Sequence, residues 1–336
     1  MLKGHQSWRF DSQPVILSSA AVGGPFEAKG PLAADFDILH EDIWLGQESF
    51  EKAERKFLEH ACEKAVEKAN IKMEDINFFL SGDLMNQITP SGFTARTMAI
   101  PYIGIFGACS TSMEGLAIGS KIMDNGGADY ILVATSSHNA AAEKQFRYPT
   151  EYGSQKPPTA QWTVTGAGAA VLAKAGVGPR ITSATIGRVI DMGITDPFNM
   201  GAAMAPATVD TIEAHLRDFD LSPDYYDLIA TGDLGCTGHP IARELLDKHG
   251  IKIKDDIFTD CGMLIYDEKQ KIFSGGSGCG CSATVTYGHI LNRMRRGELK
   301  KILIVATGAL LSPISYQQKD SIPCIAHAVS IENLLN

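Results

Sequence analysis

Residues 109–135 read CSTSMEGLAIGSKIMDNGGADYILVAT, and residues 281–307 read CSATVTYGHILNRMRRGELKKILIVAT. The two stretches align without a gap at an offset of 172 residues, and both begin with Cys-Ser and end with Val-Ala-Thr. In each of them a helical pattern is followed by a glycine-containing break and then by a short apolar run, as in a helix that leads into a buried strand. This self-similarity predicts two halves with the same fold.

A second pair of similar segments supports the duplication. Residues 77–84 read NFFLSGDL and residues 227–234 read DLIATGDL, so both are short apolar runs that end in Gly-Asp-Leu. This pair precedes the Cys-Ser pair in both halves, so the parts follow the same order. The segment 174–179, KAGVGP, suits a linker, and we expect an N-terminal half over 1–175 and a C-terminal half over 176–336.

The periodicity of apolar residues predicts an α/β protein. Apolar residues recur every three or four positions over 49–69, which is typical of an amphipathic helix that ends near Asn70. A similar pattern covers 209–219, and Pro240 suits the first turn of a helix that ends before Gly250. Short runs that are apolar on both faces predict strands buried between helix layers. These runs lie at 76–80, 130–134, 227–230 and 302–306.

Composition and charge limit the classes of function. The 336 residues are 44% apolar and 21% charged, which is typical of a globular protein. Thirty basic and 39 acidic residues give a net charge of −9, which argues against a nucleic-acid partner bound through bulk charge. We see no signal peptide and no apolar run long enough for a transmembrane helix, so we expect a cytosolic fold whose membrane association, if any, is peripheral.

The seven cysteines are expected to be reduced thiols, because their number is odd and the chain is long. Cys279-Gly-Cys281 lacks the spacing of a structural zinc site, and no metal site is expected. The glycine-rich segment 275–281 lets the backbone approach a ligand or another strand, but it spells no nucleotide-binding fingerprint.

The strongest candidate for chemistry is Cys109. An apolar stretch at 102–106 precedes it and a helical pattern follows, which predicts a strand-to-helix turn with Cys109 at a helix N-terminus. Such a position lowers a thiol pKa and binds anions, so Cys109 and Ser110 could form a nucleophilic or carboxylate-binding site. A small thiol buried under a glycine-rich turn explains the same pattern equally well.

Polar residues after the predicted strand at 130–134 form a second candidate group. His138 and Asn139 lie where ligands gather in α/β folds, and His138 could also move a proton. Arg147 could pair with a carboxylate in a bidentate manner. A solvated loop and a surface arginine are the plainer alternatives.

Two further residues are weaker candidates. Asp83 matches Asp233 across the duplication, which favours a structural turn, but Asn86 and Gln87 follow it and could extend a site. His239 in Gly-His-Pro could face a site or belong to a capping loop.

The chain resembles the thiolase superfamily, whose members condense or cleave acyl-CoA thioesters, because it is duplicated and carries a cysteine on a strand-to-helix turn. Within that superfamily it is similar to the stage V sporulation protein AD family. The similar stretches include GACSTSMEGLAI at 107–118, ATSSHNAAAEKQFRYPTEYG at 134–153, TDPFNMGAAMAPA at 195–207 and VATGALLSP at 305–313.

That resemblance implies a thiolase-like, five-layered αβαβα fold built from two duplicated halves, and a homodimer. It further implies binding of dipicolinic acid for its uptake into the developing spore, with calcium carried by the ligand and no cofactor of the protein's own. The expected location is the cytoplasmic face of the forespore or spore inner membrane, where membrane proteins of the same sporulation operon are the expected partners.

Departures from working thiolases favour binding over catalysis. Cys109 matches the thiolase nucleophile, but Phe273 stands where the second, acid/base cysteine is expected. Gly238-His239-Pro240 resembles the thiolase G-H-P-x-G loop, although Ala242 replaces its second glycine. Without a competent acid/base pair the reaction should be slow, since proton transfer contributes about 10²–10⁴-fold.

We therefore expect no catalytic residue and a dipicolinate site. The candidate ligand-binding residues are Cys109, Ser110, His138, Asn139, Arg147 and Asp83. Two alternatives stay open. One is an acyltransferase that uses Cys109, His239 and a CoA thioester, and the other is a scaffold whose pocket is vestigial.

Overall fold

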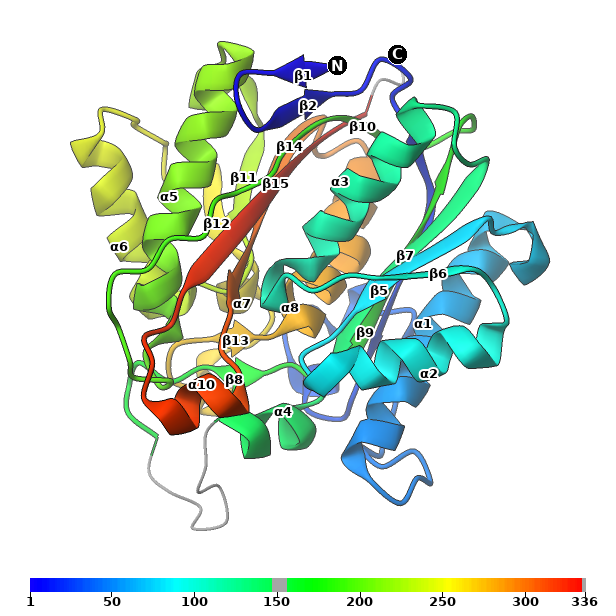
Figure 1. Ribbon diagram of the computed structural model, residues 1–336, viewed down its shortest axis with the longest axis horizontal. Helices are drawn as coiled ribbons and strands as arrows, with labels where there is room; N and C mark the ends of the chain where they lie inside the picture. Colours follow the sequence, from blue (N-terminus) through cyan, green and yellow to red (C-terminus); the bar gives the residue numbers. More distant parts are fainter. Residues whose placement is uncertain (147–155, 334–336) are drawn as a thin grey trace.

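Each half of the chain forms a five-stranded mixed sheet in the computed structural model, which describes residues 1–146 and 156–333 (Figure 1). In the first half the strand order is β6-β5-β7-β9-β3, and in the second half it is β12-β11-β14-β15-β10. The first set consists of β3 (Val15–Gly23), β5 (Phe78–Gly82), β6 (Tyr102–Gly104), β7 (Tyr130–Ser137) and β9 (Gly166–Ala173). The second set consists of β10 (Arg180–Thr185), β11 (Leu228–Thr231), β12 (Phe258–Asp260), β14 (Lys301–Ala309) and β15 (Cys324–Glu332).

The two sheets repeat the same strand directions. β5 is parallel to β6 and β7, while β9 is antiparallel to β7 and β3. In the same way β11 is parallel to β12 and β14, while β15 is antiparallel to β14 and β10. The duplication and the buried strands predicted from the sequence are therefore confirmed. The interval from 174 to 179 separates β9 from β10, and the boundary between 175 and 176 stays a prediction.

Two helices form the layer between the sheets. They are α3 (Thr111–Asp124) and α8 (Cys279–Thr284), the second continuing through a π-helical turn at Val285–Ile290 into α9 (Leu291–Arg295). α3 packs against β7 of the first sheet and against β14 and β15 of the second, and α8 packs against β7 and β9. Leu116 and Tyr287 are fully buried in this central core. Most residues of α3 and all residues of α8 are buried, while Lys121 of α3 stays partly exposed.

Helix pairs cover the two outer faces. α1 (Phe50–Ala69) packs on β3, β7 and β9, and α2 (Thr89–Met98) packs on β5. α5 (Met200–Phe219) packs on β14 and β15, with α6 (Gly235–Lys248) beside it. The layers therefore run helix, sheet, helix, sheet, helix, as expected (Figure 1).

Local signals explain where these helices begin and end. The Ser49 hydroxyl accepts a hydrogen bond from the Lys52 N–H, and Asn70 ends α1 in the left-handed conformation, so the predicted bounds are confirmed. The prediction that Pro240 lies in the first turn was wrong, because α6 begins at Gly235 and Pro240 is its sixth residue, whereas the predicted end before Gly250 is confirmed. At this position the missing N–H of proline costs one hydrogen bond inside the helix.

Smaller elements complete the chain. These are β1 (Leu2–Lys3), β2 (Ser7–Arg9), β4 (Ile38–Leu39), α4 (Asn139–Phe146), β8 (Trp162–Thr163), α7 (Cys261–Leu264), β13 (Gly276–Ser277) and α10 (Pro313–Gln318). β13 pairs with β8 in a separate two-stranded sheet. Among the described helices, none combines the length and the apolar character that crossing a bilayer requires.

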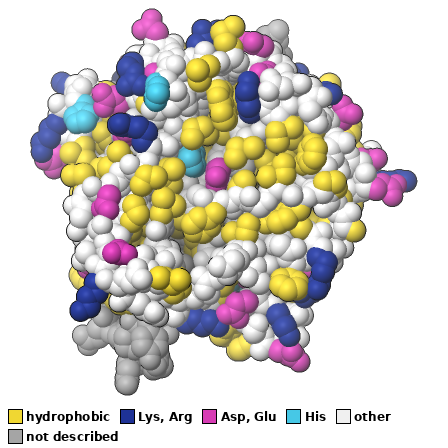
Figure 2. Space-filling model, viewed as in Figure 1, with side chains coloured by type: hydrophobic (Ala, Val, Ile, Leu, Met, Phe, Trp, Pro, Cys, Tyr) yellow, Lys and Arg dark blue, Asp and Glu magenta, His cyan; other side chains and the backbone are white. Residues whose placement is uncertain are grey.

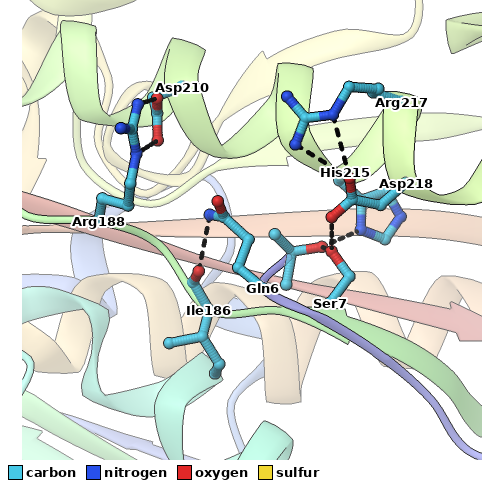
Figure 3. Close-up of polar contacts among 9 residues, drawn as sticks. Gln6, Ser7, Ile186, Arg188, Asp210, His215, Arg217 and Asp218 are labelled. Atoms are coloured by element: carbon cyan, nitrogen blue, oxygen red, sulfur yellow. Dashed lines mark hydrogen bonds and ion pairs between the residues drawn. The ribbon is translucent and has the colours of Figure 1, made fainter. Parts of the chain in front are cut away.

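The N-terminal strand β2 connects the first half to the second through backbone pairing and side-chain hydrogen bonds (Figure 3). It pairs with β10, and the Ser7 hydroxyl donates a hydrogen bond to Asp218 Oδ2 over 2.7 Å and lies 2.8 Å from Thr185 Oγ1. Thr185 Oγ1 is in turn 2.8 Å from Nδ1 of the buried His215. Burial lowers the pKa of His215 to about 3, so this network holds a neutral imidazole.

Leu116→Ala should lower the free energy of unfolding by about 2–5 kcal/mol, because a fully buried leucine between two sheets leaves a cavity that neither sheet can close. Urea titration followed by circular dichroism measures the change. Val177→Ala, at a side chain that is 73% exposed, is the control and should change stability by less than about 0.5 kcal/mol. Equal effects of the two variants would contradict the layer assignment.

Candidate functional site

Cys109 lies on a tight turn between β6 and α3, as predicted. The 3-10 turn Ala108–Ser110 leads directly into α3, and Ala108 has a φ of +50°, a left-handed conformation that is uncommon for a residue with a side chain. Side chains hold the turn: Thr111 Oγ1 donates to the Ala108 carbonyl over 2.7 Å, and Ser110 Oγ donates to the Gly107 carbonyl over 2.6 Å. The Ser110 hydroxyl is fully buried and closes the turn, so it does not line the cavity described below.

Gly308 on β14 lets the second half approach this turn closely. A Cβ atom at position 308 would lie 2.2 Å from the Gly107 carbonyl oxygen and 3.2 Å from the Ser110 nitrogen. Both of these atoms belong to the backbone, so no side chain can move aside. The glycine therefore fixes how near the Cys109 turn comes to the second sheet.

A small cavity of about 30 Å³ opens beside Cys109. Small-molecule sites span about 300–1,000 Å³, so a ligand of that size would need the cavity to widen. Its walls are mostly apolar, and the polar groups among them belong to Cys109, Glu143, Thr163 and Ser277. The apolar lining residues are Leu84, Phe106, Ala108, Ala142, Met200, Ala309 and Leu311. Both halves contribute, so the cavity lies where the halves meet.

Glu143 is the acidic group of the cavity, and the sequence analysis did not single it out. It is on α4, where its Oε1 accepts a hydrogen bond from Thr163 Oγ1 over 3.2 Å and its Oε2 pairs with Lys156 Nζ over 3.2 Å. Its sequence neighbours form an ordinary amphipathic segment, so no local signal marks it. Only the packing of α4 against β8 brings it to Cys109.

Asp233 lies behind Cys109, although Asp233 comes from the second half. It follows β11 and is fully buried. Its carboxylate accepts hydrogen bonds from Thr307 Oγ1 over 2.5 Å, from Ser277 Oγ over 3.0 Å and from the Gly278 N–H over 3.0 Å. The repeated Gly-Asp-Leu motif drew attention to Asp233 in the sequence, but it predicted only a structural turn at this residue.

The expectation that the turn lowers the pKa of Cys109 was wrong. Cys109 is only 6% exposed, and burial raises the pKa of its thiol well above the usual value. The negative charge of Asp233 and the neighbouring Cys279 raise the pKa further. Desolvation and a like charge therefore outweigh the helix N-terminus, and the thiol is neutral near pH 7.

Asp83 occupies the equivalent place in the first half but lies outside the cavity lining. Its carboxylate accepts hydrogen bonds from the Met85 N–H over 2.8 Å, the Ser91 N–H over 2.8 Å and the Ser91 hydroxyl over 2.6 Å. Burial raises the pKa of Asp83 to about 6. The structure thus gives Asp83 a role in holding the start of α2, in agreement with the structural alternative.

His138 faces away from Cys109. Successive side chains of β7 alternate in direction: Ser136 bonds Glu54 of α1, and Ser137 Oγ accepts from the Gly280 N–H of α8. The next residue, His138, turns back to the outer layer, where its Nε2 is 2.9 Å from the Ile43 carbonyl and its ring packs 5.1 Å from that of Phe50. Burial lowers the pKa of His138, so a neutral side chain here packs under α1.

Two other candidates follow His138 in the sequence. The Asn139 N–H donates to Thr165 Oγ1 over 3.0 Å, which places Asn139 at the start of α4, and it does not line the cavity. Its buried Nδ2 has no hydrogen-bond partner among the described residues. Arg147 lies outside the described residues, so its role stays a prediction.

The residues expected to supply acid/base chemistry do not reach the cavity. His239 lies on α6 in the outer layer, where its ring packs 4.3 Å from that of Phe258 and the pKa of its imidazole is lowered by burial to about 4. Phe273 is 52% exposed, and neither residue belongs to the cavity lining. Over residues 1–146 and 156–333, no cluster of three or more His, Cys, Asp or Glu side chains could hold a metal ion.

Comparisons with known proteins agree on family and fold. The family model described as Stage V sporulation protein AD matches residues 4–332. Stage V sporulation protein AD of Bacillus subtilis (strain 168) is 50% identical over 333 residues, which is 98% of each chain.

Solved structures of condensing enzymes share the fold at low sequence identity. A single-residue variant of Xanthomonas campestris OleA matches with a TM-score of 0.62 and 14% identity over 98% of this chain and 100% of that chain. The 3-oxoacyl-[acyl-carrier-protein] synthase III of Aquifex aeolicus VF5 matches with a TM-score of 0.58 and 13% identity over 95% and 99%. The predicted thiolase-like fold is therefore confirmed, and at these identities the likeness concerns the fold alone.

Gly308→Ala should lower the free energy of unfolding by about 1–3 kcal/mol, because the new methyl group meets backbone atoms of the Cys109 turn. Guanidinium titration measures the change. The matched control is Gly92→Ala on α2, where a Cβ has no neighbour within 4 Å and should stabilise the helix by up to about 1 kcal/mol. A neutral Gly308→Ala variant would show that the halves are not in close contact at this turn.

Proposed function

The chain belongs to the stage V sporulation protein AD family, and we propose that it binds dipicolinic acid for uptake into the developing spore. One observation carries the proposal: a largely apolar cavity meets a neutral, buried thiol at a position where the thiolase resemblance expects a nucleophile. Such a cavity can bind a molecule, but its neutral thiol is not suited to attack that molecule.

The lining of the cavity supplies groups that suit the proposed ligand. Dipicolinate is a planar pyridine ring with two carboxylates, so it needs flat apolar walls and hydrogen-bond donors at its edges. Phe106, Met200 and Leu311 supply such walls. Lys156, which pairs with Glu143 and lies 4.9 Å from the centre of the Trp162 ring, brings positive charge to the Glu143 side of the cavity. Calcium would enter with the ligand.

Several features argue against the alternative of a CoA-dependent acyltransferase. Attack on a thioester requires a thiolate, and the surroundings of Cys109 favour the thiol. The acid/base residue of that alternative, His239, belongs to the outer layer, as does His138. No histidine, lysine or arginine occurs among the described residues that line the cavity, so the lining offers no evident general base other than a carboxylate.

We propose that the protein works at the cytoplasmic face of the forespore or spore inner membrane. The family assignment supports a sporulation role. The proposed partners are membrane proteins of the same sporulation operon, which would hold the protein at the membrane surface. The net charge of −9 supports partners other than nucleic acid.

We also propose a homodimer formed through the face that carries α3 and β6. β6 is the last strand of its sheet, so its outer backbone groups lack a neighbouring strand within the sheet. Hydrophobic side chains form a broad band on this face (Figure 2). Phe106 is 48% exposed, and Ile103 and Ile118 are only partly buried. A second copy could extend the sheet and cover these side chains.

Cys109→Ala should weaken dipicolinate binding by about fivefold, because it removes the thiol from the wall of the cavity. Titration calorimetry of the whole protein measures the dissociation constant, with and without calcium. The exposed Cys236→Ala is the control and should bind as the unmodified protein does. A pyridine dicarboxylate with its carboxylates at other ring positions should fail to bind.

Two outcomes would contradict the proposal. Absence of saturable binding by the unmodified protein would remove dipicolinate as the ligand. Equal affinity of Cys109→Ala and Cys236→Ala would move the ligand away from the Cys109 cavity.

Ile103→Lys should convert the proposed dimer to a monomer, because it places a charge on the edge strand β6 in the middle of the contact. Light scattering at micromolar concentration measures the mass. Met192→Lys, at a side chain that is 66% exposed and far along the chain from β6, should leave the mass unchanged. A monomeric unmodified protein would exclude this dimer.

A further inference from the structure

We propose that a second cavity, beside the N-terminal strand β2, binds a small zwitterion with one carboxylate, one ammonium group and an apolar side chain, as in an apolar α-amino acid. The cavity holds about 290 Å³, close to the lower limit of small-molecule sites, which is about 300 Å³. Its wall contains one cation, Arg9, and one carboxylate, Glu332, together with tyrosine, serine and threonine hydroxyls and two apolar side chains. The inference goes beyond the proposed function and concerns a different ligand.

The register of three strands brings Arg9 and Glu332 to one face of the sheet. β10 lies between β2 and β15, and Ser183 of β10 is the partner of Arg9 on one side and of Ser330 on the other. Paired residues of neighbouring strands point to the same face, and so do residues two positions apart in one strand, which adds Glu332. The backbones at Arg9 and Ser330 are two strand spacings apart, about 10 Å. Opposite charges therefore lie on either side of the two serine hydroxyls.

The two charged groups do not pair with each other. Within the parts of the chain that the structure describes, the Arg9 guanidinium forms no ion pair and no hydrogen bond. Glu332 Oε1 accepts hydrogen bonds from the Tyr225 hydroxyl over 3.0 Å and from Thr182 Oγ1 over 3.1 Å. Its Oε2 accepts none from the same parts of the chain. One carboxylate oxygen is thus fixed, while the other oxygen and the guanidinium are available to a ligand.

The charges of the wall select against simple ions. A plain anion would meet the carboxylate of Glu332, and a plain cation would meet the guanidinium of Arg9, whereas a zwitterion pairs with both. Burial raises the pKa of Tyr225 to about 12 and also raises the pKa of Tyr226, so both hydroxyls stay protonated and uncharged. The nearby Lys301 lies 3.9 Å from the centre of the Tyr225 ring.

A network of hydrogen bonds holds the polar wall in place. Tyr226, which is only 3% exposed, has its hydroxyl 2.7 Å from His215 Nε2 and 3.3 Å from Ser330 Oγ. On its other side the His215 ring contacts Thr185, and Thr185 contacts Ser7 of β2 (Figure 3). The strand that carries the guanidinium is therefore fixed two residues before it. A wall that is already ordered loses little freedom when a ligand binds.

The apolar part of the wall comes from the end of α5. Phe219 is the last residue of that helix, and its ring lies 4.9 Å from the ring of His215. Leu221 follows two residues later and also lines the cavity. These two side chains offer a surface for an apolar side chain of the ligand, while the charged groups bind its two ends.

Titration calorimetry of the whole protein with L-leucine tests the site. We expect saturable binding in the millimolar range or tighter. N-acetyl-L-leucine lacks the cation and L-leucinamide lacks the carboxylate, so each should bind about tenfold more weakly, because one charge of the wall then has no partner. Absence of saturable L-leucine binding would overturn the proposal. Tighter binding of N-acetyl-L-leucine would also overturn it, since that result indicates a site for plain anions.

Two variants assign the ends of the ligand. Arg9→Gln should weaken L-leucine binding about tenfold and leave L-leucinamide binding unchanged, because L-leucinamide has no carboxylate. Glu332→Gln should weaken L-leucine binding and leave N-acetyl-L-leucine binding unchanged. A misfolded variant would lose all three ligands, so the pattern separates recognition from stability. Arg188→Gln, at an arginine that is ion-paired outside the cavity, is the matched control and should bind L-leucine as the unmodified protein does. Unchanged L-leucine affinity in both cavity variants would refute the site.

The length of α3 separates this cavity from Cys109. Cys109 lies just before the first turn of α3, whereas the Ser12 N–H, close in sequence to Arg9, donates to Asp124 at the last residue of α3 over 2.9 Å. The helix has 14 residues, which corresponds to about 20 Å. The two ligands should therefore bind without competition.

Dipicolinate titration of the same samples distinguishes this inference from the proposed function. L-leucine binding with no dipicolinate binding would support the second cavity and count against the proposed function. Dipicolinate binding with no L-leucine binding would do the reverse. Competition between the two ligands would place them in one site and overturn the inference.

Discussion

The burial of α3 and α8 between two sheets is the constraint on which the rest of the structure depends. Both helices are largely buried, so small and apolar residues predominate in them, while Lys121 of α3 stays partly exposed. Gly115 lets α3 lie close to β7, because a Cβ at this position would be 2.5 Å from Val133 Cγ1. The helices also meet each other, since Ser112 Oγ and Ser282 Oγ are 2.8 Å apart. This contact brings the Cys109 turn of one half against α8 of the other, where the Ser282 hydroxyl donates to the Cys109 carbonyl over 3.2 Å.

The two halves contain the same duplicated elements, but equivalent residues of these elements have different surroundings because the halves pack differently. Cys109 and Cys281 are equivalent in the repeat, yet Cys109 borders the cavity and Cys281 belongs to the central core. The difference arises because the cavity forms on one side of the contact between the halves. Elements without an equivalent role in the other half, such as α4 with Glu143, then complete its walls.

At this site a cysteine at the start of a central helix is kept as a neutral thiol. A cysteine at a helix N-terminus is activated only if solvent, a base or a cation stabilises its thiolate. Here burial and the Asp233 carboxylate oppose ionisation, and the nearest candidate bases along the sequence pack in the outer layers. The turn at Ala108, which has a left-handed φ, holds Cys109 at the start of α3, while burial, more than the charge of Asp233, keeps its thiol neutral.

The sequence by itself determined the repeat, the strand and helix types, the turn at Cys109 and the family, because these depend on periodicity and on motifs that are local. The tertiary structure decided which candidates share a site. The alternation of side chains along β7 places His138 on the outer face. His239 lies in the outer layer because α6 begins upstream of Pro240. The hydroxyl of Ser110 bonds the backbone of its own turn. Glu143 reaches the cavity, and Asp233 bonds Ser277 of its wall, through packing between segments far apart in the chain. Spacing in the sequence cannot encode that packing, since the direction of a side chain depends on the neighbours that cover it.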